Sequence, residues 1–124
     1  MSADEISLTL PADDAFRRVA HLVLGGLAVR LELTYENLED IELALDTLLE
    51  RSGDGGKGDV TVRVRVEGDQ LRTVVGPVAP ALLRELEREV GEGIDVRRIL
   101  ETTCDGIEVS GDTVALTKRL SGAR

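Results

Sequence analysis

The sequence predicts an α+β two-layer sandwich, in which helices cover one face of a mixed, mostly antiparallel sheet. Apolar residues alternate with polar ones in some segments and recur at helical spacing in others, and the turns Gly68-Asp69 and Gly111-Asp112 each join two alternating segments. The predicted order is β-α-α-β-β-α-α-β-β. A chain of 124 residues that is 42% hydrophobic can build one core. We therefore expect a single domain over residues 1–124, with residues 121–124 as a frayed tail.

A strand and a long helix are predicted first. Residues 6–10 alternate in polarity, and Pro11 ends the strand. The following helix is capped by Asp13 or Asp14, and its apolar positions continue to residue 27. The pair Gly25-Gly26 falls within this pattern. It either allows another helix to pack closely or marks the helix end.

A second helix is predicted after Thr34, which is a suitable N-cap residue. Its apolar stripe consists of Leu38, Ile41, Leu45, Leu48 and Leu49. The helix is expected to stop at Gly53, and the glycine-rich residues 53–58 that follow have the composition of a loop.

The clearest strand of the chain is predicted at residues 60–66, where valines alternate with polar residues. Residues 71–75 form its hairpin partner. The polar face of this hairpin carries Arg63, Arg65 and Arg72. These side chains either pair with the acidic second helix or are simply solvated.

Two shorter helices and a closing hairpin complete the chain. Pro80 opens an amphipathic helix that runs to Val90, and Gly91-Glu92-Gly93 interrupts it. Residues 94–104 form the next helix, with Ile99, Leu100 and Thr103 facing inward. Strands around residues 107–109 and 114–116 then pair across the last turn.

The charge of the chain limits its partners. The net charge is −9, and there are one Tyr, one Phe and no Trp. Neither a nucleic acid nor an anionic membrane is an expected partner, because both repel such a chain. Residues 32–50 hold seven acids and no base. They are either a solvated helix face or a docking surface for a basic protein, whose candidate residues are Glu36, Glu39, Asp40, Glu42, Asp46 and Glu50.

The rare reactive residues predict no metal or thiol chemistry. Cys104 is the single cysteine, which excludes an internal disulfide and suggests a reducing compartment. The acidic start of the chain has no apolar h-region, and no apolar run of about 18 residues is present. We therefore expect a cytoplasmic protein. His21 lies among apolar neighbours, and one His with one Cys is a poor basis for a metal site.

Three stretches of the chain resemble the anti-sigma-factor serine kinases of the GHKL (Bergerat) ATPase superfamily. Residues 38–45 are similar to the start of the family's nucleotide-binding helix, and residues 59–75 to its two central strands. Residues 99–109, followed by 113–120, resemble its last helix and closing hairpin. The resemblance spans about residues 5–120. It implies the histidine-kinase-like ATPase fold.

The resemblance also implies where nucleotide chemistry would occur. The family's second helix carries a Glu that serves as general base and, four residues later, an Asn that holds Mg²⁺. Thr47 and Arg51 stand at these two positions. Thr is not a carboxylate base, and Arg is a cation that repels Mg²⁺.

The other two nucleotide motifs of the family are also altered. The Asp that binds the adenine amino group is replaced by Gly76 or Pro77, neither of which has a side-chain acceptor. The phosphate-binding Gly-x-Gly aligns with Ile94 and Val96. The family's flexible lid is replaced by the helix that begins at Pro80, and its apolar face is expected to fill the vacated nucleotide cavity.

Two classes of function follow. The first is a non-catalytic, anti-sigma-factor-like interaction module without a cofactor or metal, which resembles a homodimer that holds a sigma factor or a STAS-domain antagonist. The second is an ATP- and Mg²⁺-dependent serine-protein kinase that uses a shifted motif set of Asp46, Glu50, Gly91 and Gly93. The altered motifs favour the first class and make an enzyme the less expected outcome.

Overall fold

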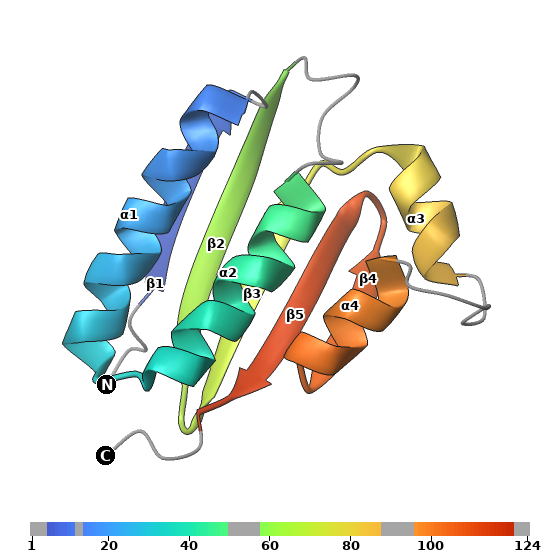
Figure 1. Cartoon of the computed structure of the whole chain (residues 1–124). Coiled ribbons are helices and arrows are strands. Elements are labelled where there is room, and N and C mark those ends of the chain that lie inside the picture. Colours follow the sequence, from blue (N-terminus) through green and yellow to red (C-terminus); the bar gives the residue numbers. More distant parts are fainter. Residues whose placement is uncertain (1–4, 12–13, 50–57, 88–95, 121–124) are drawn as a thin grey trace.

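The computed structural model describes residues 5–11, 14–49, 58–87 and 96–120. Four helices lie on one face of a five-stranded sheet (Figure 1). The elements are β1 (Glu5–Pro11), α1 (Asp14–Leu31), α2 (Tyr35–Leu49), β2 (Asp59–Glu67), β3 (Gln70–Gly76), α3 (Pro80–Glu87), α4 (Val96–Thr103), β4 (Gly106–Ser110) and β5 (Thr113–Arg119). This is the predicted order and the predicted two-layer α+β architecture.

The sheet has the strand order β1-β2-β3-β5-β4. Every pairing among the described strands is antiparallel. Two of these pairs are the predicted hairpins, β2–β3 and β4–β5. The last strand does not lie at an edge, because β5 is inserted between β3 and β4.

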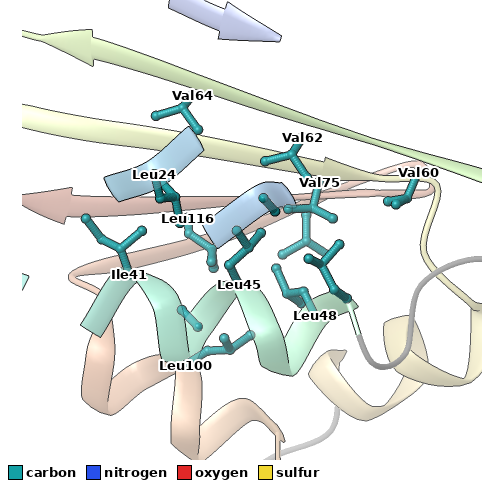
Figure 2. Packing of buried hydrophobic residues seen from close by; sticks show 14 of the residues in the cluster. Leu24, Ile41, Leu45, Leu48, Val60, Val62, Val64, Val75, Leu100 and Leu116 are labelled. Carbon is teal, nitrogen blue, oxygen red and sulfur yellow. The ribbon is translucent and has the colours of Figure 1, made fainter. Parts of the chain in front are cut away.

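The core lies between the sheet and the helices (Figure 2). In β2 the valines at positions 60, 62 and 64 point toward the helices and are at most 4% exposed. From the helix layer, Leu45 and Leu48 of α2 and Leu100 of α4 are almost completely buried. The apolar residues that alternate along β2 and those that recur at helical spacing along α2 thus belong to the same core, as their sequence patterns predict.

The glycine pair does not end the first helix, because α1 continues through Gly25 and Gly26 to Leu31. Nor does the pair pack closely against any described residue of this chain. A Cβ added at either glycine would have no heavy atom within 4 Å. A glycine inside a helix costs about 1 kcal/mol relative to alanine, so the pair destabilises α1 without a compensating contact among the described residues.

The arginines of the central hairpin do not contact the acidic helix. In β2 the arginines alternate with buried valines, so Arg63 and Arg65 lie on the sheet face opposite the helices. There Arg65 pairs with Glu67 at 3.3 Å, and Arg72 pairs with Glu108 at 3.4 Å. Of the two alternatives, pairing with the second helix is therefore wrong, because the sheet separates the two groups.

Some predicted boundaries fall outside the described residues. These are the expected helix stop at Gly53, the loop at residues 53–58 except for Gly58, the last turn of the third helix before Val90, and the tail at residues 121–124. No described helix is long and apolar enough to cross a membrane.

Candidate functional site

The helix α2 carries both the predicted docking residues and the predicted catalytic positions. The Thr34 hydroxyl caps it by accepting a hydrogen bond from the Asn37 backbone N–H at 3.1 Å. Its inner face is fixed by Ile41, Leu45 and Leu48, which are at most 4% exposed. This rotation places the acidic residues on the outer face and flanks of the helix.

The acidic residues differ in how far they reach solvent. Glu36 and Glu39 are exposed, whereas Asp40, Glu42 and Asp46 are half-buried. Glu50 lies outside the described residues. Tyr35 is 73% exposed next to this surface, and the neighbouring Glu39 carboxylate raises the pKa of its phenol. Glu36, Glu39 and Tyr35 are therefore the most accessible part of the predicted docking surface.

Cationic or titratable side chains of the chain itself contact the half-buried acids. His21 Nε2 lies 2.7 Å from Asp46 Oδ1, and His21 Nδ1 lies 3.5 Å from Glu42 Oε2, which ties α1 to α2. The Lys118 ammonium donates to Asp40 Oδ2 at 2.8 Å and ties β5 to α2. The predicted acidic face is thus not uniformly solvated, because three of its members also hold the helix in place.

The predicted base position is occupied by a side chain that bonds its own helix. Thr47 is half-buried, and its hydroxyl donates to the Leu43 carbonyl one turn earlier at 2.8 Å. A hydroxyl is not a carboxylate, and its oxygen is too weakly basic to take a proton from a substrate. Arg51, at the predicted metal-ligand position, lies outside the described residues.

The predicted adenine-binding position is closed by a neighbouring strand. Gly76 ends β3 and is buried beside the first residue of β5. A Cβ at Gly76 would lie 2.5 Å from Thr113 Cγ2 and 3.2 Å from Thr113 Cα. Real Cβ atoms do not approach so closely, so a side chain has no space at this position. The next residue, Pro77, is exposed, whereas Val78 is 4% exposed and donates its N–H to the Asp112 carbonyl.

Helix α3 stands where the resemblance places a lid. Leu82 and Leu86 are at most 1% exposed and belong to the main core. The Arg97 guanidinium of α4 donates to the Leu86 carbonyl, which joins the end of α3 to α4. The described apolar face of this helix is therefore buried in the core; that it fills a former nucleotide cavity stays a prediction.

A small cavity lies between α2 and the sheet among the described residues. This cavity of about 10 Å³ lies among Ala44, Leu45, Thr73, Cys104 and Leu116. This is room for about one water molecule. Burial raises the pKa of the Cys104 thiol, which keeps the sulfur protonated and unreactive near neutral pH.

The remaining predicted nucleotide positions are not brought together by the described structure. Ile94, Gly91 and Gly93 lie outside the described residues. For Val96, which begins α4, the structure describes the backbone but not the side chain. Of the shifted motif set, Asp46 is described, and its carboxylate contacts His21. The described residues contain no group of three His, Cys, Asp or Glu side chains that could hold a metal ion.

Comparison with known proteins identifies the family, although no family model matches the chain. The serine-protein kinase RsbW of Bacillus velezensis is 31% identical over 147 aligned positions, which cover 99% of this chain and 90% of that protein. The chain belongs to the RsbW serine-protein kinase family. The RsbW of Bacillus subtilis is 29% identical over the same share of both chains.

A solved structure shares the fold. The RsbU and RsbW domains of a Mycobacterium tuberculosis protein superimpose with a TM-score of 0.66 at 19% identity. The match covers 94% of this chain and 32% of that one, so the chain spans about a third of that larger protein. The RsbW-type fold is the histidine-kinase-like fold predicted from the sequence.

Sequence reasoning missed three residues that shape this site. Thr113 closes the space beside Gly76, and His21 and Lys118 hold the acidic residues of α2. The available signal for Thr113 was a β-branched residue at the start of the last strand, which pairs beside Gly76. Using that signal requires the β3–β5 register, which a single sequence does not supply.

Proposed function

We propose that this RsbW-family chain is a non-catalytic regulatory module that binds a protein partner and has lost ATP binding. The observation that carries the proposal is the contact between Gly76 and Thr113. The resemblance places the family's Asp at Gly76 or Pro77, and neither residue has a side-chain acceptor. If the position is Gly76, a Cβ there would already lie 2.5 Å from the Thr113 methyl group. A site that depends on one buried acceptor loses most of its selectivity when that acceptor is absent.

Two further features support the loss of nucleotide chemistry. Thr47 stands in place of the general base, and its hydroxyl donates a hydrogen bond to the Leu43 carbonyl. The helix that replaces the lid buries Leu82 and Leu86 in the core, so it cannot open and close over a ligand without exposing them. We expect no cofactor and no metal. Ile94 and Val96, in place of the phosphate-binding glycines, agree with this expectation.

The proposed partner is a sigma factor or a STAS-domain antagonist with a basic surface, as the resemblance implies. The docking surface is the acidic outer face of α2, and its most accessible members are Glu36 and Glu39. We further propose that the protein acts in bacterial partner switching or transcription regulation, as a homodimer in the cytoplasm. Since nucleotide no longer controls it, partner binding would be constitutive or governed by another signal.

The first experiment is a calorimetric titration of the purified chain with ATP and with ADP, each in the presence of Mg²⁺. We expect no heat of binding and no thermal stabilisation up to millimolar nucleotide. A positive control is a catalytically intact RsbW, such as the Bacillus subtilis protein, under the same conditions. Micromolar binding by this chain would overturn the proposal and favour the serine-protein kinase suggested by the names of its relatives.

The second experiment tests the docking surface with a purified sigma factor from the chain's own source organism. We expect the charge reversals Glu36→Lys and Glu39→Lys to slow association and to flatten its dependence on salt, because rim charges act mainly on the on-rate. Asp69→Lys, a reversal in the exposed β2–β3 turn, is the matched control. Equal binding by all three variants would remove α2 from the proposal.

A further inference from the structure

The outer face of α1 exposes large apolar side chains. Leu22 is 76% exposed and Val29 is 81% exposed. They are seven residues apart, which is close to two helical turns, so they lie on one side of the helix. The opposite side holds Ala20, Leu24 and Leu27, which pack into the core. In Figure 1 this outer side of α1 faces away from the sheet.

The glycine pair lies midway between these two apolar residues. Leu22 precedes Gly25 by three positions, and Val29 follows Gly26 by three. A Cβ at either glycine would meet open space, so no contact within the described chain explains why both positions lack a side chain. A second helix that crosses at this point would explain both, because glycine lets two helix backbones approach closely.

The sequence of this face is self-complementary. If two copies of α1 cross antiparallel at the glycine pair, the two-fold axis places Leu22 of one copy beside Val29 of the other. The charges follow the same symmetry. Arg18 precedes the pair by seven residues and Glu32 follows it by six, and both are exposed. The crossing therefore brings Arg18 of each copy toward Glu32 of the other, which gives two opposite-charge pairs.

We propose that the surface made of Arg18, Leu22, Gly25, Gly26 and Val29 of α1, with Glu32 in the turn that follows the helix, binds the same surface of a second copy of the chain. The inference rests on the homodimer proposed above and adds the surface that forms it. A helix of 18 residues is about 27 Å long and about 10 Å wide. Such a face is smaller than the standard interface of about 800 Å² per partner. The expected dimer therefore dissociates in the micromolar range.

Sedimentation velocity on the full chain, from about 1 to about 300 µM, tests this surface. Wild type is expected to shift from monomer to dimer over the range. Leu22→Glu is expected to stay monomeric, because it buries a charge at the crossing. The control is Leu43→Glu, which places the same charge at a 51% exposed leucine of α2 and is expected to dimerise like wild type. Circular dichroism checks that each variant is folded.

The outcomes separate the two claims. A wild type that remains monomeric throughout overturns both the dimer and the surface. A dimer that survives Leu22→Glu overturns the surface and leaves the homodimer intact, since another face then forms it. Neither result depends on nucleotide or on a partner protein, so this test stands apart from the loss of ATP binding.

A double variant at the glycine pair separates helix stability from dimerisation. Gly25→Ala with Gly26→Ala is expected to raise the melting temperature of the monomer, because alanine favours helix. The same double variant is expected to weaken dimerisation at least tenfold, because the added methyl groups keep the helices apart. Equal or tighter dimerisation would contradict the crossing at this point.

The charge pairs are tested by exchange. Arg18→Glu is expected to weaken the dimer, because it faces Glu32 of the other copy. Combining it with Glu32→Arg restores opposite charges across the axis and is expected to recover most of the lost affinity. A double variant that binds more weakly than either single variant would rule out the antiparallel arrangement.

Discussion

The substitution Gly76→Ala tests most directly whether Thr113 has closed the old adenine position. It adds one carbon at 2.5 Å from Thr113 Cγ2 and 3.2 Å from both Thr113 Cα and Cβ, where an ordinary contact is 3.4 Å or more. Thr113 has little freedom to retreat, since its hydroxyl donates to the Ser110 carbonyl at 2.8 Å. Overpacking of this kind costs about 1–3 kcal/mol.

A matched glycine in the same sheet provides the control. Gly106 in β4 also faces a threonine of β5, but a Cβ there would lie 3.6 Å from Thr117 Cβ, an ordinary contact. Gly106→Ala is therefore expected to be neutral or to stabilise by up to about 1 kcal/mol. The predicted difference between the two variants is about 2 kcal/mol in the free energy of unfolding, measured by urea denaturation. It corresponds to roughly 6–10 °C in melting temperature for a chain of this size.

A double-mutant cycle assigns the cost to the methyl group. Thr113→Ser removes Cγ2, the nearest of the three atoms, and is expected to relieve Gly76→Ala by about 1 kcal/mol. By the same argument, Gly76→Asp is expected to destabilise the fold without restoring ATP binding. The reasoning is refuted if Gly76→Ala and Gly106→Ala unfold at the same urea concentration, or if Thr113→Ser leaves the effect of Gly76→Ala unchanged.

Three other perturbations have defined outcomes. Leu82→Ala is expected to cost about 2–5 kcal/mol in urea denaturation, since Leu82 is fully buried; a cost below 1 kcal/mol would mean that α3 is not part of the core. Lys118→Ala is expected to cost about 1 kcal/mol, because the Lys118 side chain is 16% exposed but its partner Asp40 is 41% exposed and partly screened; an effect that vanishes in 1 M salt would indicate a purely surface pair. Burial raises the pKa of Cys104, so its alkylation by iodoacetamide is expected to lag behind that of a free thiol at pH 8 and to keep rising at more alkaline pH. The folded state holds this proton more tightly than the unfolded state, so the contribution of Cys104 to stability is present at neutral pH and is lost as the pH rises through the raised pKa. Alkylation as fast as that of the urea-unfolded chain would contradict its burial.

Local patterns were sufficient to predict the order of the helices and strands and the two hairpins. The alternation of valines in β2 and the apolar stripe of α2 each reflect one buried face, and a single sequence displays such periods directly. The turns at residues 68–69 and 111–112 fixed the two hairpins, since such turns join adjacent antiparallel strands. The insertion of β5 between β3 and β4 was not predicted, because the pairing of distant strands leaves no periodic trace in a single sequence.

The candidate site was predictable only in part, for the same reason. Comparison with the family's motif positions was enough to show that Thr47 stands in place of a Glu and that Gly76 or Pro77 stands in place of an Asp, and these differences predicted the loss of ATP binding. The side chain that fills the space at position 76 comes from a strand 37 residues later. The contacts of Asp46 with His21 and of Asp40 with Lys118 likewise join distant segments. Helical periodicity placed these acids on the outer side of α2 but could not reveal their partners.

The position of β5 in the sheet has a consequence for synthesis of the chain. Val114 and Leu116 of β5 are buried, and β5 pairs with β3 on one side and β4 on the other. While the chain emerges from the ribosome, β1, β2 and β3 can pair in turn, but the outer edge of β3 stays open until residues 113–119 are free. During that interval the apolar side chains of β3 and the helices lack their cover. A ribosome that stalls before β5 would thus release an incomplete sheet with an exposed edge, a species that chaperones and proteases recognise.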